Sequence, residues 1–258
     1  MYKSLLLFLR IGVFSNLILF FLTLNYVNND VDPFIMIPTQ ILLVVSAYRC
    51  LFPVNYASKA VILDSIFSSV FITRFVVTVV EVVYIYAFSQ VIRIINADQF
   101  LIVDIFSWIM VAQVIVSQFF CWGAILIKYE RLYFYEELGW FIIFLCNAIA
   151  SAILFSLDLT SGHYTLLILN LIFGALYLPW QVFHLKSITD RINKDDNIKQ
   201  QLFDLNSNRV FGELQKSFKE RKLSFDRSDW GGVVGMMWMY GYWILIIPVW
   251  MFFIILTI

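Results

Sequence analysis

Residues 59–100 of this 258-residue chain read KAVILDSIFSSVFITRFVVTVVEVVYIYAFSQVIRIINADQF. Most of this stretch is apolar enough to cross a bilayer, yet Arg74 and Glu81 lie well inside it. A charge inside a membrane costs about 2.5–3.5 kcal/mol on insertion scales, so it usually faces a bundle interior or a wet cavity. Arg74, Thr78 and Glu81 are spaced i, i+4 and i+7, which puts them on one helix face. This polar stripe predicts that other helices pack against the segment.

The composition of the whole chain indicates a polytopic membrane protein. Hydrophobic residues make up 61% of the chain and charged residues 14%, whereas soluble domains have about 45–50% and about 25%. The 18 basic residues balance 18 acidic ones, and they do not alternate with exposed aromatic residues. Nucleic acid is therefore not an expected partner. Aromatic residues make up 18% of the chain, which suits an apolar core with belts at the two interfaces.

Seven segments are long enough to span a bilayer, since a core of about 30 Å needs about 20 apolar residues per helix. Their predicted bounds are 4–27, 34–52, 60–92, 100–127, 137–157, 164–185 and 233–258. Pro38 and Pro248 lie inside two of these segments and predict kinks there. We therefore expect an all-α integral membrane bundle of seven transmembrane helices, forming a single domain over residues 1–258.

The distribution of basic residues predicts the orientation of the helices. Lys3, Lys59 and Lys128 lie near one set of helix ends, and residues 186–230 on the same side contain ten basic residues. The opposite loops, at 28–33, 96–99 and 158–163, contain none. The positive-inside rule therefore places the N-terminus in the cytoplasm and the C-terminus outside.

The segment 186–230 is expected to be a cytoplasmic loop that contains an amphipathic helix. Val210, Phe211, Leu214 and Phe218 recur at helical spacing and share one face, while Lys216 and other basic residues lie off that face. This pattern predicts a helix lying on the inner membrane surface. A helix that docks a protein partner is the alternative reading.

Polar residues near the middle of the predicted spans are the first candidate site. By helical rise, almost every span brings one such group close to the bilayer midplane. The candidates are Asn16, Gln40, Arg74, Thr78, Glu81, Gln113, Asn147, Asn170, Tyr240 and Tyr242. Amides alone can act as contacts between helices, worth roughly 0.6 kcal/mol on average, but Arg74 and Glu81 favour a polar pocket. We expect Arg74 and Glu81 to face inward and to be linked electrostatically, directly or through water and a neighbouring helix. Gln113 and Asn147 are the best candidate partners by depth.

A second group of charges is predicted at the inner mouth of the bundle. It consists of Arg49, Asp64, Glu136, Glu137 and His184. Asp64 is expected to open the third helix, and Glu136 and Glu137 the fifth. Carboxylates in the first turn of a helix are stabilised by the positive end of the helix dipole. This capping role alone would explain the three acidic residues, with no binding or catalytic role. The alternative is a carboxylate pair facing a basic group, which would titrate in two steps and serve acid/base chemistry.

No metal or cofactor is expected. His163 and His184 lie at opposite ends of one predicted helix, about 30 Å apart, so they cannot share a metal ion. Cys50, Cys121 and Cys146 show no CxxC spacing, and the chain has no motif for a phosphate cradle or an activated nucleophile.

Three classes of function are consistent with these patterns. The first is a transporter or channel for a small solute or ion, or a receptor-like protein, that uses the Arg74 and Glu81 pocket. The second is an intramembrane enzyme that acts on a lipid or isoprenoid by carboxylate acid/base chemistry. The third is a non-catalytic subunit of a membrane assembly. Membrane lipids are expected partners in each case, and a membrane-protein partner or a second copy of the chain stays open. The sequence does not indicate which cellular membrane holds the protein.

Overall fold

The computed structural model describes residues 2–25, 31–194 and 206–258. Within these residues, seven helices are long and apolar enough to cross a membrane. Their bounds are Leu6–Asn25, Pro33–Leu51, Val70–Asn96, Leu101–Ile127, Arg131–Leu154, Ser161–Lys194 and Gly232–Thr257. The predicted all-α class and the seven spans are thus confirmed, and the chain is a multi-pass membrane protein.

The chain forms two compact units. The first comprises Met1–Tyr84 with Leu214–Leu256, and the second comprises Ile85–Glu213 with Thr257–Ile258. Helix α4 (Val70–Asn96) begins in the first unit and ends in the second.

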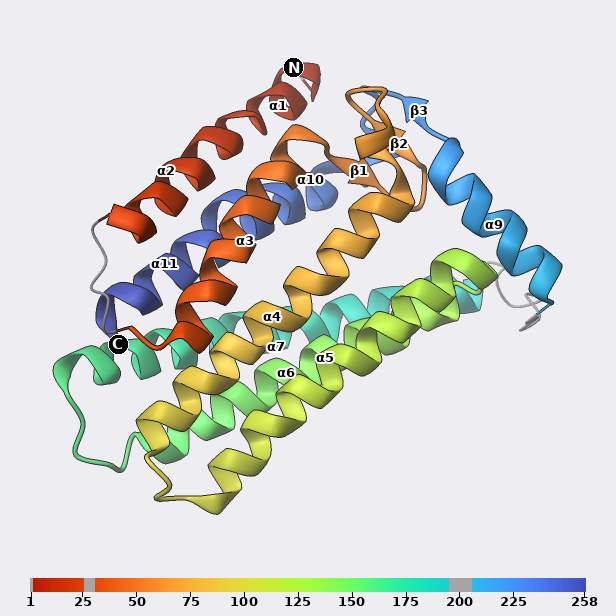
Figure 1. Cartoon of the computed structure of the whole chain (residues 1–258). Helices are drawn as coiled ribbons and strands as arrows, with labels where there is room; N and C mark the ends of the chain where they lie inside the picture. The colour runs from red at the N-terminus through yellow and green to blue at the C-terminus, as the bar shows by residue number, and fades with distance from the viewer. Residues whose placement is uncertain (1, 26–30, 195–205) are drawn as a thin grey trace. The chain divides into compact units, whose positions relative to one another are not determined.

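The first unit is built around the helices α2 (Ile11–Asn25) and α3 (Pro33–Leu51), which pack along each other (Figure 1). A short helix, α1 (Tyr2–Phe8), precedes α2. The last predicted span consists of α10 (Gly232–Tyr240), a π-helical segment and α11 (Ile247–Thr257).

The π-helical segment, Gly241–Leu245, contacts both α2 and α3 and adjoins the proline that predicted a kink. Pro248 has no N–H to donate and its ring clashes with the carbonyl four residues earlier, so a regular α-helix is not favoured here. The Trp243 carbonyl instead accepts a hydrogen bond from the fully buried Asn16 amide, at 2.8 Å. A polar side chain from a neighbouring helix thereby satisfies a carbonyl inside the apolar packing.

A small sheet precedes α4 and shortens the predicted third span. Strand β1 (Val54–Asn55) pairs antiparallel with β2 (Ala60–Val61), which pairs parallel with β3 (Lys222–Leu223). A one-turn 3-10 helix, Ile66–Ser68, follows, with the Ser65 hydroxyl accepting from the N–H of Phe67. The prediction that a helix begins at residue 60 is therefore wrong. Short polar residues before Val70 offer the backbone local hydrogen bonds that compete with a helix.

Asp64 consequently does not open a helix, which corrects the expectation from the sequence. It is exposed, and its carboxylate accepts a hydrogen bond from Arg221 Nε at 2.8 Å. Near it, Lys222 Nζ lies 2.6 Å from Asp229 Oδ2, and Ser224 also donates to that carboxylate. These hydrogen bonds, that of Lys222 first, hold the pKa of Asp229 below its ordinary value. The acidic and basic residues around β3 therefore largely neutralise one another.

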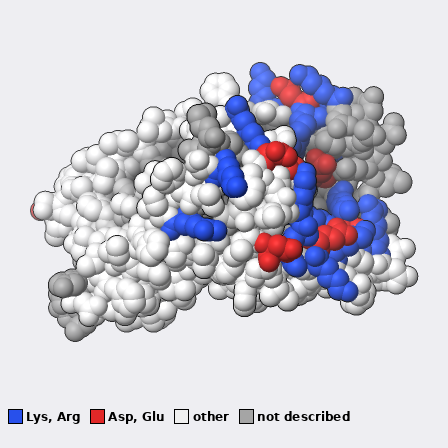
Figure 2. Space-filling view, turned by 90° about the horizontal axis from the view of Figure 1, so that it is seen from above, with Lys and Arg blue, Asp and Glu red and all other residues white. Residues whose placement is uncertain are grey.

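In the space-filling view, charged side chains gather over part of the visible surface, and most of the rest is uncharged (Figure 2). Exposed apolar side chains are numerous on the spanning helices, including Phe14, Phe21, Leu101, Phe119 and Leu176. Such a surface suits contact with lipid rather than water.

In the second unit, α5 (Leu101–Ile127) packs on α6 (Arg131–Leu154), and α6 packs on α7 (Ser161–Lys194). Lys128 adopts a left-handed conformation after α5, with φ of 54°, so the connection to α6 is short.

Helix α6 therefore starts at Arg131, earlier than expected. Its first turn contains no acidic residue, so the prediction that Glu136 and Glu137 open this helix is wrong. Helix α7 continues to Lys194, beyond the predicted end at residue 185, through a polar segment that contains no Gly or Pro.

The predicted amphipathic helix is present as α9 (Ser207–Lys219). Val210, Leu214 and Phe218 are half-buried, whereas Phe211 is 61% exposed. Phe218 stacks on Phe71 of α4 with ring centroids 4.0 Å apart. The helix thus carries one apolar face, part of which packs on the protein.

Candidate functional site

The first unit contains a cavity of about 150 Å³ lined by charged and aromatic side chains. Four segments contribute: the end of α3, the β1–β2 connection, the first half of α4, and α10 with the π-helical segment. The lining residues are Arg49, Tyr56, Arg74, Val77, Glu81, Trp238, Met239, Tyr242 and Trp243.

Arg74 and Glu81 form a buried ion pair at this cavity. Arg74 Nη2 lies 3.2 Å from Glu81 Oε2, and the two residues are only 3% and 6% exposed. Because α4 begins at Val70, Arg74 lies about one turn into the helix, nearer to its end than the sequence predicted. The two Cα atoms are separated by about 10 Å of helical rise, which the long arginine side chain spans.

A second helix supplies a hydrogen bond to this pair. Tyr242, in the π-helical segment, donates from its hydroxyl to Glu81 Oε1 at 3.3 Å. The Tyr84 hydroxyl lies 2.7 Å from that of Tyr242, so the three groups form a chain. The partner expected for Glu81 was Gln113 or Asn147, and the one that the first unit provides is Tyr242. On α4 itself, Val77 lines the cavity between the two charges, and Thr78 is half-buried beside it.

Arg49 reaches the same cavity from the last turn of α3, although the sequence predicted that it belongs to a separate group of charges. It is 3% exposed. Its Nη2 donates to the Val54 carbonyl at 3.3 Å and weakly to Met239 Sδ at 3.9 Å. Its guanidinium carbon lies 5.4 Å from the Tyr56 ring centroid and 5.3 Å from that of Trp243. Aromatic faces therefore provide much of its electrostatic stabilisation.

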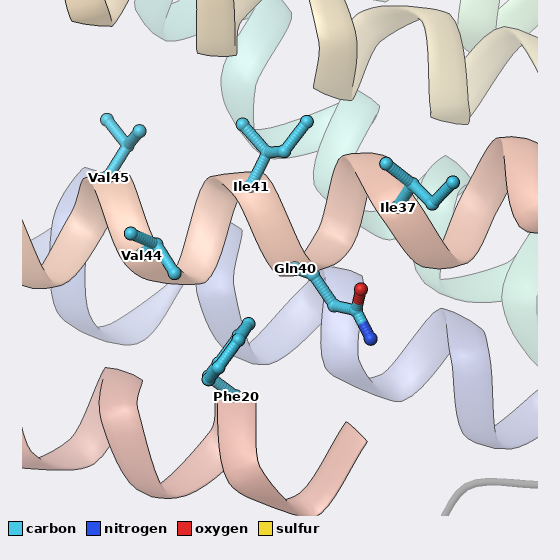
Figure 3. Close-up of a pocket in the computed structure, with 6 residues that line it drawn as sticks. All are labelled: Phe20, Ile37, Gln40, Ile41, Val44 and Val45. Atoms are coloured by element: carbon cyan, nitrogen blue, oxygen red, sulfur yellow. The ribbon is translucent and has the colours of Figure 1, made fainter. Parts of the chain in front are cut away.

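Gln40 lies elsewhere in the first unit. It lines an apolar groove of about 330 Å³ between α2 and α3 with Phe20, Ile37, Ile41, Val44 and Val45. Figure 3 shows Gln40 and Phe20 pointing into the space between these two helices. The Gln40 amide donates to Thr23 Oγ1 at 3.2 Å, so its role here is a contact between helices. The apolar walls of the groove suit a lipid chain better than a charged ligand.

The remaining predicted pocket residues lie in the second unit. The Gln113 amide lies so close to Gly139 of α6 that a Cβ there would meet Nε2 at 2.7 Å. The Asn170 amide donates to Ser151 Oγ at 3.3 Å. Asn147 is buried, and its Oδ1 has no hydrogen-bond partner among the described residues. Gln113 and Asn170 thus act in close packing between α5, α6 and α7.

The predicted inner-mouth charges divide between the units. Arg49 and Asp64 belong to the first unit, and Glu136, Glu137 and His184 to the second. Glu137 Oε2 accepts from the Gln181 amide at 2.7 Å, and its Oε1 lies 3.7 Å from His184 Nε2. Glu136 is buried one position earlier in α6. The structure thus brings Glu137 next to His184.

Five cavity residues were not predicted as site residues: Tyr56, Val77, Trp238, Met239 and Trp243. Tyr56 follows Arg49 closely in the segment YRCLFPVNY, residues 48–56, whose Pro53 prevents α3 from continuing. An arginine and a tyrosine on either side of a helix-ending proline could have indicated that Tyr56 belongs to the same site as Arg49. The two tryptophans carried no such signal, because eight tryptophans lie between residues 108 and 250 and the local pattern does not distinguish these two.

No known protein family, curated protein or solved structure matches this chain. Across residues 2–25, 31–194 and 206–258, no group of three or more His, Cys, Asp and Glu residues could hold a metal ion. The fold and the cavity therefore define the class: a multi-pass protein of seven membrane-spanning helices with buried charges at a cavity.

Proposed function

We propose that this membrane protein binds a small polar solute or ion in the Arg49–Arg74–Glu81 cavity and acts as a transporter, channel or receptor-like protein. One observation carries the proposal: three buried charged side chains from two helices border a single cavity. Charges in a membrane span are costly and mark ligand or ion pathways more often than simple packing. A helix pair held together only by packing needs small residues and amides, as between α5 and α6, and no cavity.

Water access to the cavity tests the proposal. Val77 is 1% exposed and lines the cavity, so a cysteine there would meet water only if the cavity is hydrated and open. We expect Val77→Cys, in the full chain in a lipid bilayer, to react with a water-soluble thiol reagent. The reason is that the reactive thiolate forms in a polar environment and hardly at all in an apolar one.

The matched control is Val79→Cys on the same membrane-spanning helix, which is 47% exposed and does not line the cavity. We expect this cysteine to stay unmodified, because lipid excludes both the reagent and the thiolate. The three native cysteines are buried, so the unsubstituted chain gives the background. If Val77→Cys is folded and reacts no faster than Val79→Cys, the cavity is dry and the proposed function is wrong.

A further inference from the structure

Arg49 is a buried cation whose hydrogen-bonding capacity is largely unused. Its Nε and Nη1 atoms are buried and have no hydrogen-bond partner in the part of the chain that the structure describes. Nε carries one hydrogen and Nη1 two, so three of the five guanidinium N–H groups are unsatisfied. Buried polar groups are nearly always satisfied, and each exception calls for an explanation such as a bound water or ion.

The charges around the cavity do not cancel. Arg74 and Glu81 neutralise each other, and no carboxylate in residues 2–25, 31–194 or 206–258 lies within ion-pair distance of Arg49. Two guanidinium groups and one carboxylate leave a net charge of +1 at the cavity. A single negative charge on a ligand would balance it.

The shape of the site also restricts the ligand. A cavity of about 150 Å³ is comparable to one that holds a benzene molecule. Tyr56 and Trp243 flank the guanidinium group, and Val77, Trp238 and Met239 add apolar walls. Such walls suit a small apolar body attached to the anionic group. Guanidinium groups bind the two oxygens of a carboxylate or phosphate through parallel hydrogen bonds.

We propose that this cavity binds the oxoanion of a monoanionic ligand, with Arg49 as its hydrogen-bond donor and counter-charge. The proposal rests on the proposed function and names the chemical class of its solute. Arg74 pairs with Glu81, and this ion pair holds the Glu81 carboxylate away from the bound anion. A free organic monocarboxylate and the phosphodiester of an anionic lipid offer the same chemistry, and the experiment below separates them.

The test measures thermal unfolding of the purified full chain in a zwitterionic detergent, using the fluorescence of its eight tryptophans. The free probes are benzoate, benzamide and benzylammonium, which differ in charge but little in size, at matched ionic strength. The lipid probe is phosphatidylglycerol against phosphatidylcholine. A ligand that binds the folded state raises the unfolding temperature in a saturable manner. We expect benzoate to do so, and benzamide and benzylammonium to have no such effect.

Arg49→Gln should weaken this binding about tenfold or more, because the variant loses both the charge and the paired donors. Arg93→Gln is the matched control. Arg93 is a half-buried arginine on α4 that bonds to Ser89, Gln90 and Ser107 and lies over Trp108, and it does not line the cavity. This control should bind benzoate as the unsubstituted chain does. If Arg49→Gln does not fold, Arg49→Lys, which keeps the charge but not the planar fork, should still weaken binding.

Each outcome bears on the two proposals differently. Stabilisation by benzoate that depends on Arg49 supports both. Stabilisation by phosphatidylglycerol alone, again dependent on Arg49, supports the anion site but removes the free solute of the proposed function. Stabilisation by benzamide or benzylammonium and not by benzoate overturns the anion site and leaves a solute-binding cavity. No stabilisation by any probe, or equal stabilisation of Arg49→Gln by benzoate, overturns the anion site.

Discussion

At the scale of single residues, the Arg74–Glu81 pair makes a prediction about stability. Removing one partner leaves the other charge buried and unpaired, which costs about 3–5 kcal/mol. We therefore expect Arg74→Met and Glu81→Leu each to lower the unfolding temperature and the yield of folded protein sharply. The double variant should regain most of both, because a buried ion pair replaced by apolar residues of similar volume is often neutral or stabilising.

The exposed pair Arg191 and Glu130, with atoms 3.7 Å apart, is the control for this cycle. Its single and double substitutions should change stability by less than about 1 kcal/mol, as exposed pairs do. If the losses from Arg74→Met and Glu81→Leu simply add in the double variant, the two residues are not coupled, and the 3.2 Å contact does not stabilise the fold.

The sequence reveals Arg74 and Glu81 more readily than Arg49, and the reason is physical. Arg74 and Glu81 lie inside a long apolar run, where a charge must face inward. Arg49 lies two residues before the end of α3, where a long side chain normally reaches the membrane surface. The fold of residues 54–69, which places Tyr56 and the Val54 carbonyl against the guanidinium group, helps to keep Arg49 in the cavity. That fold depends on pairing with β3, more than 150 residues later in the chain, and local patterns do not carry this information.

At the scale of elements, α9 makes a prediction about the membrane surface. Phe211 is exposed in the protein, and its neighbours on the apolar face pack on the protein, so lipid is the expected environment of its ring. A spin label at Phe211→Cys should be relaxed by oxygen, which concentrates in lipid, more than by a water-soluble nickel chelate. A label at Lys219→Cys should show the reverse, because basic residues of an interfacial helix face water.

A label at Phe218→Cys provides the third reference for α9. Phe218 stacks on Phe71, so a label there should be shielded from both agents. Equal exposure of the labels at Phe211 and Lys219 to the nickel chelate would show that α9 does not lie on the membrane, and a water-exposed helix that docks a partner would then be the better reading.

The elements also show where sequence patterns fail. Hydropathy identifies all seven spans because the bilayer requires a continuous apolar helix. It misplaces their ends, because apolar residues continue beyond the span. Ala60, Val61 and Ile62 are apolar and buried, yet they belong to the small sheet and its packing against Trp230 rather than to α4. Likewise, α6 begins at Arg131, six residues before the predicted start, in a segment that contains no Gly or Pro to end a helix.

At the scale of the whole molecule, orientation is the remaining prediction, and it depends only on charge. Seven spans place the two termini on opposite sides of the membrane. The connections with most basic residues, including 186–230, follow the second, fourth and sixth spans, so the positive-inside rule puts the N-terminus in the cytoplasm. Fusions to alkaline phosphatase should be active after Asp98 and Thr160. Fusions to a fluorescent protein that folds only in the cytoplasm should fluoresce after Glu130 and Asn206.

The charged loop gives this prediction its sharpest check. If positive charge sets the orientation, replacing Lys216, Lys219, Arg221 and Lys222 by Gln should weaken the preference, and a fraction of the Asn206 fusions should then report the outside. A matched set of acidic substitutions, at Glu213 and Glu220, should leave the orientation unchanged, because acidic residues contribute little to the rule. An outside signal from the unsubstituted chain at Asn206 would reverse the predicted orientation. The cavity, which lies near the start of α4, would then belong to the outer half of the membrane, and an anion would reach Arg49 from outside the cell or organelle.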